Sequence, residues 1–145
     1  MNVKKILFPT DFSTCSDAGL KYATSLARDM GATLLIVHVE EPPIAYGGGE
    51  FYYGMPDPDD VALREMLSQV KPGDDAVPCE RRLIVGDPAE AIVDLAEDEG
   101  VDMIVMGTHG RTGVRRLLMG SIAERIVRTA SCPVLTIKHP RPQTA

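Results

Sequence analysis

Several residue types are scarce in this sequence, and each shortage excludes a class of protein. There is no tryptophan, aromatic residues make up 5% of the chain, and there are three cysteines, Cys15, Cys79 and Cys132. Cysteines that are odd in number and far apart, without a C-x-x-C pair, argue against a disulfide scaffold and a zinc site and favour a reducing compartment. No stretch approaches the roughly 20 apolar residues of a membrane span. The apolar run Ile6–Phe8 is too short for the core of a signal peptide, so we expect a cytoplasmic protein with no membrane contact.

Basic residues are also in the minority. Lysine and arginine number 15 against 21 aspartate and glutamate residues, which gives a formal net charge of −6. Proteins that bind nucleic acid usually carry a basic surface, so this balance argues against a nucleic-acid partner. The rest of the composition is that of an ordinary globular protein, 44% hydrophobic and 25% charged in 145 residues. With no internal repeat and no linker, residues 1–145 are expected to form a single domain.

Five short apolar runs alternate with helical patterns along the chain. The runs are Ile6–Phe8, Leu34–Val37, Leu83–Val85, Met103–Met106 and Val134–Ile137. They are continuous rather than alternating with polar residues, which is typical of strands covered on both faces. Between them apolar residues recur at helical spacing, and a weaker helix is predicted over 59–69. The order predicts a single doubly wound α/β domain with a parallel sheet and helices on both faces.

Short capping patterns mark the expected ends of the helices. Asp87–Glu90 places an aspartate before a proline, with a glutamate at the third position of the helix. Ser121–Glu124 has the form of a capping box, which predicts Ser121 as the N-cap of the last helix. Gly31 and Gly100 stand where the preceding helices should end.

The expected topology places a candidate ligand site at one edge of the sheet. In an open α/β sheet, ligands bind outside the carboxyl ends of the strands, where the winding direction reverses. Pro9–Asp11 follows the first apolar run, Val39-Glu40 ends the second, and Gly107–Ser121 follows the fourth. If the first strand is central and the fourth lies beside it, these three segments converge on one cleft.

The segment after the fourth run has the character of an anion site. Glycines at positions 107, 110, 113 and 120 permit a close backbone approach, and the segment ends at the N-terminus of a helix, where free amides favour phosphate. Between Gly107 and Cys132 there are five arginines and one acidic residue, Glu124, which gives this segment a local charge of +4. A positive segment in an acidic protein fits a small polyanion. There is no G-x-x-x-x-G-K-[S/T] and no G-x-G-x-x-G motif, which excludes a Walker-type NTPase and the dinucleotide fingerprint.

The glycine spacing carries a resemblance to a known family. Gly107-Thr108-His109-Gly110, followed by nine residues and Gly120-Ser121, resembles the G-x2-G-x9-G-[S/T] pattern of the ATP-binding branch of the universal stress protein family. The segments KKILFPTDFS, LLIVHV, VDMIVMGTHG and CPVLTIK are similar to strands of that family, so the resemblance covers nearly the whole chain. It implies five parallel strands in the order 3-2-1-4-5.

The resemblance also implies a ligand, ATP with Mg, and a set of site residues. Pro9, Thr10, Asp11 and Val39 would line adenine and ribose, and Met106 and Gly107 would close the ribose side. Gly110, Gly120, Ser121 and Ile122 would hold the phosphates, with His109 and Arg111 beside them in the loop. Members of the family commonly form homodimers, and here the last strand, an edge, is expected to pair with its copy. The implied function is a nucleotide-dependent regulatory switch in the stress response, and not an enzyme.

Plainer interpretations remain for several of these residues. Asp11 could be a turn residue after a strand, Ser121 could serve only as a helix cap, and His38 fits a structural histidine within a strand. Two other functions also remain open. A slow ATPase would need Asp11 or His109 to orient water, and a nucleotide-free interaction module would result if residues 40–58 block the cleft. We otherwise expect that Gly/Tyr-rich segment to close over the ligand.

Overall fold

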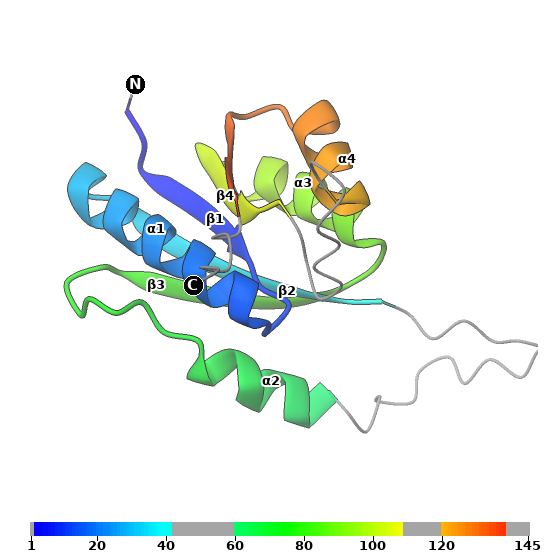
Figure 1. Cartoon of the computed structure of the whole chain (residues 1–145), viewed down its shortest axis with the longest axis horizontal. Coiled ribbons are helices and arrows are strands. Elements are labelled where there is room, and N and C mark those ends of the chain that lie inside the picture. Colours follow the sequence, from blue (N-terminus) through cyan, green and yellow to red (C-terminus); the bar gives the residue numbers. More distant parts are fainter. Residues whose placement is uncertain (1, 42–59, 109–119, 139–145) are drawn as a thin grey trace, which may run out of the picture.

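The computed structural model describes residues 2–41, 60–108 and 120–138. Strands and helices alternate along the chain, and the five strands form one parallel sheet in the order β3-β2-β1-β4-β5 (Figure 1). The elements are β1 Lys5–Pro9, α1 Thr14–Met30, β2 Thr33–Glu40, α2 Asp60–Gln69, β3 Cys79–Val85, α3 Pro88–Asp98, β4 Met103–Gly107, α4 Ser121–Thr129 and β5 Val134–Ile137. The predicted α/β class and strand order are confirmed.

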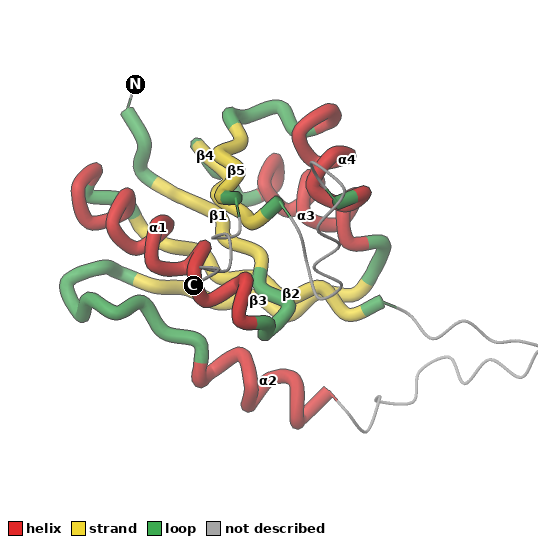
Figure 2. Tube along the Cα trace, in the orientation of Figure 1, coloured by secondary structure: helices red, strands yellow, loops and turns green. Residues whose placement is uncertain are grey.

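Helices cover both faces of the sheet, with α1 and α2 on one face and α3 and α4 on the other (Figure 2). Successive residues of a strand point to opposite faces, so the central strands divide their side chains between two cores. The core under α3 and α4 contains Leu7, Leu35, Val37, Ile92, Ile104 and Ile126. The core under α1 and α2 contains Ile6, Phe8, Ala23, Leu34, Ile36 and Leu67. Burial on both faces accounts for the continuous apolar runs of β1, β2 and β4.

The edge strand β3 differs from the prediction. It begins at Cys79, four residues before the apolar run Leu83–Val85, and most of its residues are only partly buried. The expectation that every strand is covered on both faces is therefore wrong for β3, and it is also wrong for the other edge strand, β5, where Leu135 is exposed. An edge strand has solvent along one side, so β3 tolerates the polar residues Glu80-Arg81-Arg82. Because these residues are polar, the apolar run in the sequence does not include the first half of the strand.

Most of the predicted helix ends are confirmed. Asp87 is the N-cap of α3, where its Oδ2 accepts a hydrogen bond from Glu90 N–H at 3.2 Å, and Pro88 occupies the first turn. Gly31 ends α1 in the left-handed conformation, with φ of 66°, and Gly100 follows α3 with φ of 65°.

The predicted cap of the last helix is wrong by one residue. Gly120 is the N-cap of α4, and among the described residues no side chain caps this end. Ser121 is instead the first residue inside the helix, because Glu124 N–H donates to Gly120 O at 2.9 Å and closes the first turn there. The consequence is a helix N-terminus whose first amide N–H groups donate no hydrogen bond to the side chain of the N-cap residue.

The helices and the cysteines bear on two expectations from the sequence, the lack of a membrane span and the lack of a disulfide scaffold. Among the residues that the structure describes, every helix is too short or too polar to form a membrane span. Cys79 and Cys132 are free thiols, partly buried, and burial raises the pKa of both. They behave as small apolar residues, as expected from the sequence.

Candidate functional site

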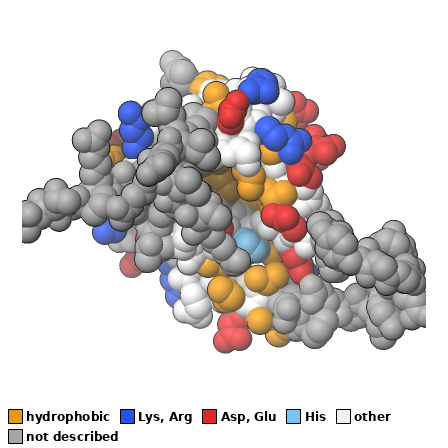
Figure 3. All heavy atoms as spheres, turned by 45° about the vertical axis from the view of Figure 1, so that its right-hand side comes forward, with side chains coloured by type: hydrophobic (Ala, Val, Ile, Leu, Met, Phe, Trp, Pro, Cys, Tyr) orange, Lys and Arg blue, Asp and Glu red, His pale blue; other side chains and the backbone are white. Residues whose placement is uncertain are grey.

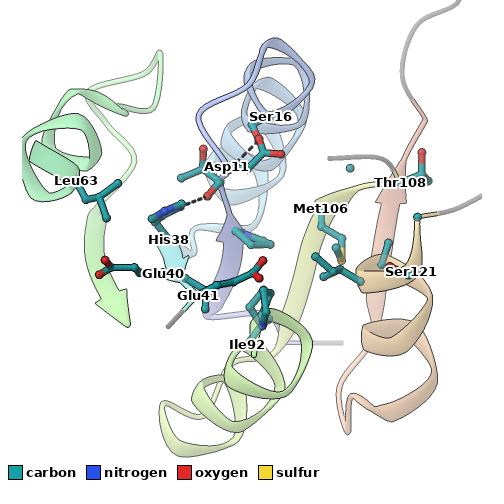
Figure 4. Close-up of a pocket in the computed structure, with 18 residues that line it drawn as sticks. Asp11, Ser16, His38, Glu40, Glu41, Leu63, Ile92, Met106, Thr108 and Ser121 are labelled. Atoms are coloured by element: carbon teal, nitrogen blue, oxygen red, sulfur yellow. Dashed lines mark hydrogen bonds between the residues drawn. The ribbon is translucent and has the colours of Figure 1, made fainter. Parts of the chain in front are cut away.

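A pocket of about 690 Å³ opens at the carboxyl edge of the sheet. Its volume lies within the roughly 300–1,000 Å³ typical of small-molecule sites. The ends of β1, β2 and β4 form its floor, and α2, α3 and the N-terminus of α4 supply its walls (Figure 4). Figure 3 looks onto this side of the molecule, where apolar and acidic side chains surround a hollow. The pocket lies where the sequence predicts a cleft, because β1 is central and lies between β2 and β4.

Nine of the twelve predicted site residues line this pocket. They are Pro9, Thr10, Asp11, Val39, Met106, Gly107, Gly120, Ser121 and Ile122. The other three, His109, Gly110 and Arg111, lie outside the described residues, as does nearly all of the Gly/Tyr-rich segment 40–58. The predicted convergence of three chain segments is therefore confirmed for their described parts.

The turn between β1 and α1 is tightly hydrogen-bonded. Asp11 Oδ1 accepts from Ser13 N–H at 3.0 Å and from Ser16 Oγ–H at 2.7 Å. Phe12 adopts a left-handed backbone with φ of 66°, and its N–H donates to Thr10 Oγ1 at 3.1 Å. Asp11 thus acts as a turn residue and lines the pocket at the same time, so the two interpretations of this residue do not exclude each other.

His38 supports the same turn from β2. Its side chain is buried, and Nδ1 lies 2.8 Å from Thr10 O. Because a carbonyl oxygen can only accept, Nδ1 must carry the proton. The imidazole also contacts the Phe12 ring, with 4.4 Å between the centroids. The structural interpretation of His38 is therefore confirmed, although the residue also lines the pocket.

The end of β2 presents peptide groups to the pocket. Thr10 N–H donates to Val37 O at 2.8 Å, and Gly86 N–H donates to Glu40 O at 3.0 Å. Alternate residues of a central strand bond to opposite neighbours, so odd-numbered residues here face β1 and even-numbered residues face β3. Val39 lies two residues beyond the last paired position of β1. Its N–H and C=O therefore point into the space past the end of β1, where the pocket lies.

The end of β4 is joined to the start of α4 by a backbone hydrogen bond. Gly120 N–H donates to Thr108 O at 2.7 Å, and Thr108 N–H donates to Ile137 O of β5 at 3.0 Å. These bonds hold the N-terminus of α4 beside the carboxyl end of β4. The first amides of a helix have no partner within the helix and carry the positive end of its dipole. This wall of the pocket is thus suited to an anion.

The described pocket lining is otherwise acidic. Asp11, Glu40 and Glu41 line it, and no lysine or arginine does so among the described residues. Two of the five arginines that gave the local charge of +4 form ion pairs elsewhere, Arg125 with Asp87 and Arg128 with Glu124. The charge argument from the sequence is therefore wrong for those two. The remaining three, at positions 111, 115 and 116, lie outside the described residues.

Metal ligands are sparse in the part of the chain that can be described. Within residues 2–41, 60–108 and 120–138 no group of three His, Cys, Asp or Glu side chains could hold a metal ion. A magnesium ion typically takes one or two carboxylates and completes its shell with water and substrate phosphates. The carboxylates of the pocket suit a metal that arrives with a phosphate ligand, and the described residues form no dedicated metal site.

Several lining residues were not predicted from the sequence. Ser16, Leu63, Pro88 and Ile92 come from α1, α2 and α3. Their patterns indicate ordinary helix residues, and only the packing of the helices against the sheet edge brings them to the pocket. Pro88 carries the one usable signal, because it begins a helix directly after a strand and so lies at the same edge.

Fold and site together define a doubly wound α/β protein with a ligand pocket at the switch point of its sheet. The family model of the universal stress protein family matches residues 2–138. The chain is 35% identical to the universal stress protein MJ0531 of Methanocaldococcus jannaschii, over 95% of this chain and 84% of that protein. The protein therefore belongs to the universal stress protein family.

Two solved structures are similar over nearly their whole length. The hypothetical protein MJ0577 of M. jannaschii, the subject of a structure-based assignment of biochemical function, has 28% identity and a TM-score of 0.76, covering 98% of this chain and 100% of that chain. A universal stress protein from Archaeoglobus fulgidus, solved in complex with dAMP, has 28% identity and a TM-score of 0.68, covering 95% and 100%.

Proposed function

We propose that this protein binds ATP, with Mg, in the pocket at the carboxyl edge of the sheet and acts as a nucleotide-dependent regulatory switch. The observation that carries the proposal is the pairing of two features on opposite sides of the pocket. One is the set of Val39 peptide groups beyond the end of β1, and the other is the α4 N-terminus without a side-chain cap. The first can read the edge of a base, and the second can bind phosphate.

The base and ribose belong on the β1–β2 side. The N–H and C=O of one peptide can pair with an acceptor and a donor on the edge of adenine, and Val39 offers both groups. Pro9, Thr10 and Met106 supply apolar and backbone surface around this position. The carboxylate of Asp11 is suited to accept hydrogen bonds from ribose hydroxyls.

The phosphates belong on the α4 side. Gly120 has no side chain to fill the space before the first amides of α4, and Ser121 and Ile122 supply those amides. Gly107 is the last residue of β4 and has no side chain to hinder a close approach to this end of the strand. His109, Gly110 and Arg111 complete this side of the proposed site. A magnesium ion bound with ATP would take most of its ligands from the phosphates and from water.

The relatives support a nucleotide as the ligand. The A. fulgidus protein of the same fold was solved with dAMP, at 28% identity to this chain. The proposal of ATP in particular rests on the glycine spacing from Gly107 to Ser121, which resembles the ATP-binding branch of the family. Mass spectrometry of the ligand that the protein retains after gentle purification tests the proposal. It should find ATP, and the finding of unrelated ligands alone, or of no ligand, would count against ATP binding.

A regulatory role is favoured over catalysis. Ser16, His38 and Asp11 all line the pocket, but they are not connected as a catalytic triad, because Ser16 Oγ–H donates to Asp11 Oδ1 and His38 Nδ1–H donates to Thr10 O. No cysteine lines the described part of the pocket. The alternative is a slow ATPase in which Asp11 or His109 orients water on the metal-bound triphosphate. A phosphate-release assay separates the two, because turnover above roughly 1 s⁻¹ lies within the range of ordinary enzymes and would overturn the switch.

We further propose a cytoplasmic homodimer that pairs through β5. This strand is an edge of the sheet, and Leu135 is 39% exposed on it. Exposed edges are commonly paired, and a twofold axis allows two copies to pair with each other. Light scattering should give twice the chain mass for the wild type and a smaller mass for Leu135→Lys. A dimer without nucleotide binding would instead favour the interaction module.

A further inference from the structure

Ser16 is a residue of α1, yet it lines the pocket beside Asp11 (Figure 4). The two residues are joined in both directions. Ser16 Oγ–H donates to Asp11 Oδ1 at 2.7 Å, and Asp11 N–H donates to Ser16 Oγ at 3.2 Å. One hydroxyl therefore fixes both the backbone and the carboxylate of Asp11.

The carboxylate has little rotational freedom as a result. Asp11 Oδ1 accepts a second hydrogen bond from Ser13 N–H at 3.0 Å, so this oxygen is held from two directions. Of these two donors only Ser16 uses its side chain. A change at Ser16 thus removes one of these two restraints on the carboxylate while the backbone donor remains.

The turn around Asp11 is strained and is held by its own hydrogen bonds. Phe12 has φ of 66°, a conformation that a bulky side chain rarely adopts. Strain of this kind persists only where surrounding contacts maintain it, and it recurs at binding sites, where it keeps groups in place before the ligand arrives. The bonds from Asp11 N–H to Ser16 Oγ and from Phe12 N–H to Thr10 Oγ1 are such contacts.

We propose that Ser16 is the positioning residue for Asp11, and that it thereby sets the preference of the pocket for nucleotides that carry ribose hydroxyls. The inference rests on the proposed function, in which Asp11 faces the ribose. A carboxylate held in one orientation can accept from a ribose hydroxyl without losing side-chain freedom on binding. A carboxylate free to rotate must be ordered first, and this cost falls only on ligands that hydrogen-bond to it.

Two nucleotides and three variants test the proposal. Calorimetry would measure the binding of ATP and of 2′,3′-dideoxyATP, which lacks both hydroxyls, to nucleotide-stripped wild type, Ser16→Ala, Ser16→Thr and Ser13→Ala. Ser13 is the matched control, because its Oγ caps α1 by accepting from Ser16 N–H at 3.3 Å, while its bond to Asp11 Oδ1 comes from the backbone N–H, which alanine keeps. Loss of this cap should lower the melting temperature by about 2–8 °C without changing the preference between ligands.

The expected result is a selective loss. Ser16→Ala should weaken ATP about tenfold, the scale of one hydrogen bond to a charged group, and dideoxyATP by less than about twofold. Ser16→Thr, which keeps the hydroxyl, should restore the preference. Equal weakening of both ligands, or of neither, would overturn the positioning role while ATP still binds the wild type. A wild type that binds no nucleotide would overturn the proposed function itself.

Discussion

Helix α2 is held to the sheet by few contacts, and Arg81 on β3 supplies several of them. Arg81 Nε donates to Leu67 O at 3.1 Å and to Val70 O at 3.2 Å, and Nη2 donates to Val70 O at 2.8 Å. These carbonyls lie at the C-terminus of α2, where a cation also interacts favourably with the helix dipole. Leu67 is the one buried side chain among the described side chains of α2. Because Leu63 on the same helix lines the pocket, Arg81 holds a wall of the site in place.

Replacing Arg81 by methionine would remove the donors and keep most of the aliphatic stem. The carbonyls at this helix end can be solvated by water, so the net loss corresponds to about one or two hydrogen bonds to a charged group, about 1–2 kcal/mol. Because so little of α2 is buried, the loss should appear first as local opening. We expect hydrogen exchange over residues 64–69 to accelerate about tenfold, with a smaller fall in the urea midpoint.

Arg82 on the same strand provides the control. Its Nε donates at 3.0 Å to Oε1 of Glu99, the C-cap residue of α3, on the opposite face of the sheet from α2. Arg82→Met removes the same charge and the same donors but should leave exchange in α2 unchanged. If Arg81→Met exchanges at the wild-type rate, or if both variants accelerate α2 equally, the anchoring role of Arg81 is refuted.

Three further predictions concern stability, each followed by urea unfolding. Lys5 Nζ and Arg82 Nε donate hydrogen bonds to Glu99 and lower the pKa of its carboxyl. The carboxylate therefore stabilises the fold above its ordinary pKa of 4.5, and this stabilisation is lost as the pH falls through the lowered pKa. Glu99→Gln should flatten this loss of stability in acid. Asp87→Ala removes the cap of α3 and the partner of Arg125 and should cost about 1 kcal/mol, whereas Asp87→Asn should keep the cap. Ile126 is fully buried, so Ile126→Ala should lower the stability by about 2–5 kcal/mol. Its neighbour Val127 is 45% exposed, so Val127→Ala should change the stability by less than about 0.5 kcal/mol.

The fold was predictable because its central elements carry simple signals. β1, β2 and β4 are buried on both faces, so their sequences are continuous apolar runs. Asp87 marks a helix end through its side-chain cap, and Gly31 marks one through its left-handed backbone. The edge strand β3 was recognised only in its last three residues, since one exposed side removes the need for apolar residues. Ser121 was misassigned because Gly120 and Ser121 are both acceptable caps, and the bond from Gly120 N–H to Thr108 O, formed across the fold, fixes which one lies outside the helix.

The site was predictable to the extent that topology determines it. Parallel strands bring their carboxyl ends to one edge, so Pro9, Val39 and Gly107 could be placed together from their order in the chain. The contributions of Ser16 and Leu63 depend on how helices pack against that edge, which no local pattern encodes. The bond between His38 and Thr10 O likewise joins residues 28 positions apart and has no sequence signature.

The most direct test of the central claim is calorimetry of the nucleotide-stripped protein with Mg-ATP, on the wild type and on Gly120→Asp. Gly120 has φ of −68° and ψ of 158°, the extended conformation of an N-cap, so an aspartate there can cap the α4 amides with its own carboxylate. The variant should keep or raise the melting temperature of the free protein while losing ATP. The wild type should bind with measurable heat and, at 100 times its dissociation constant, melt about 5 °C higher or more. No heat and no melting shift at millimolar ATP in the wild type, or unchanged binding in Gly120→Asp, would contradict the account.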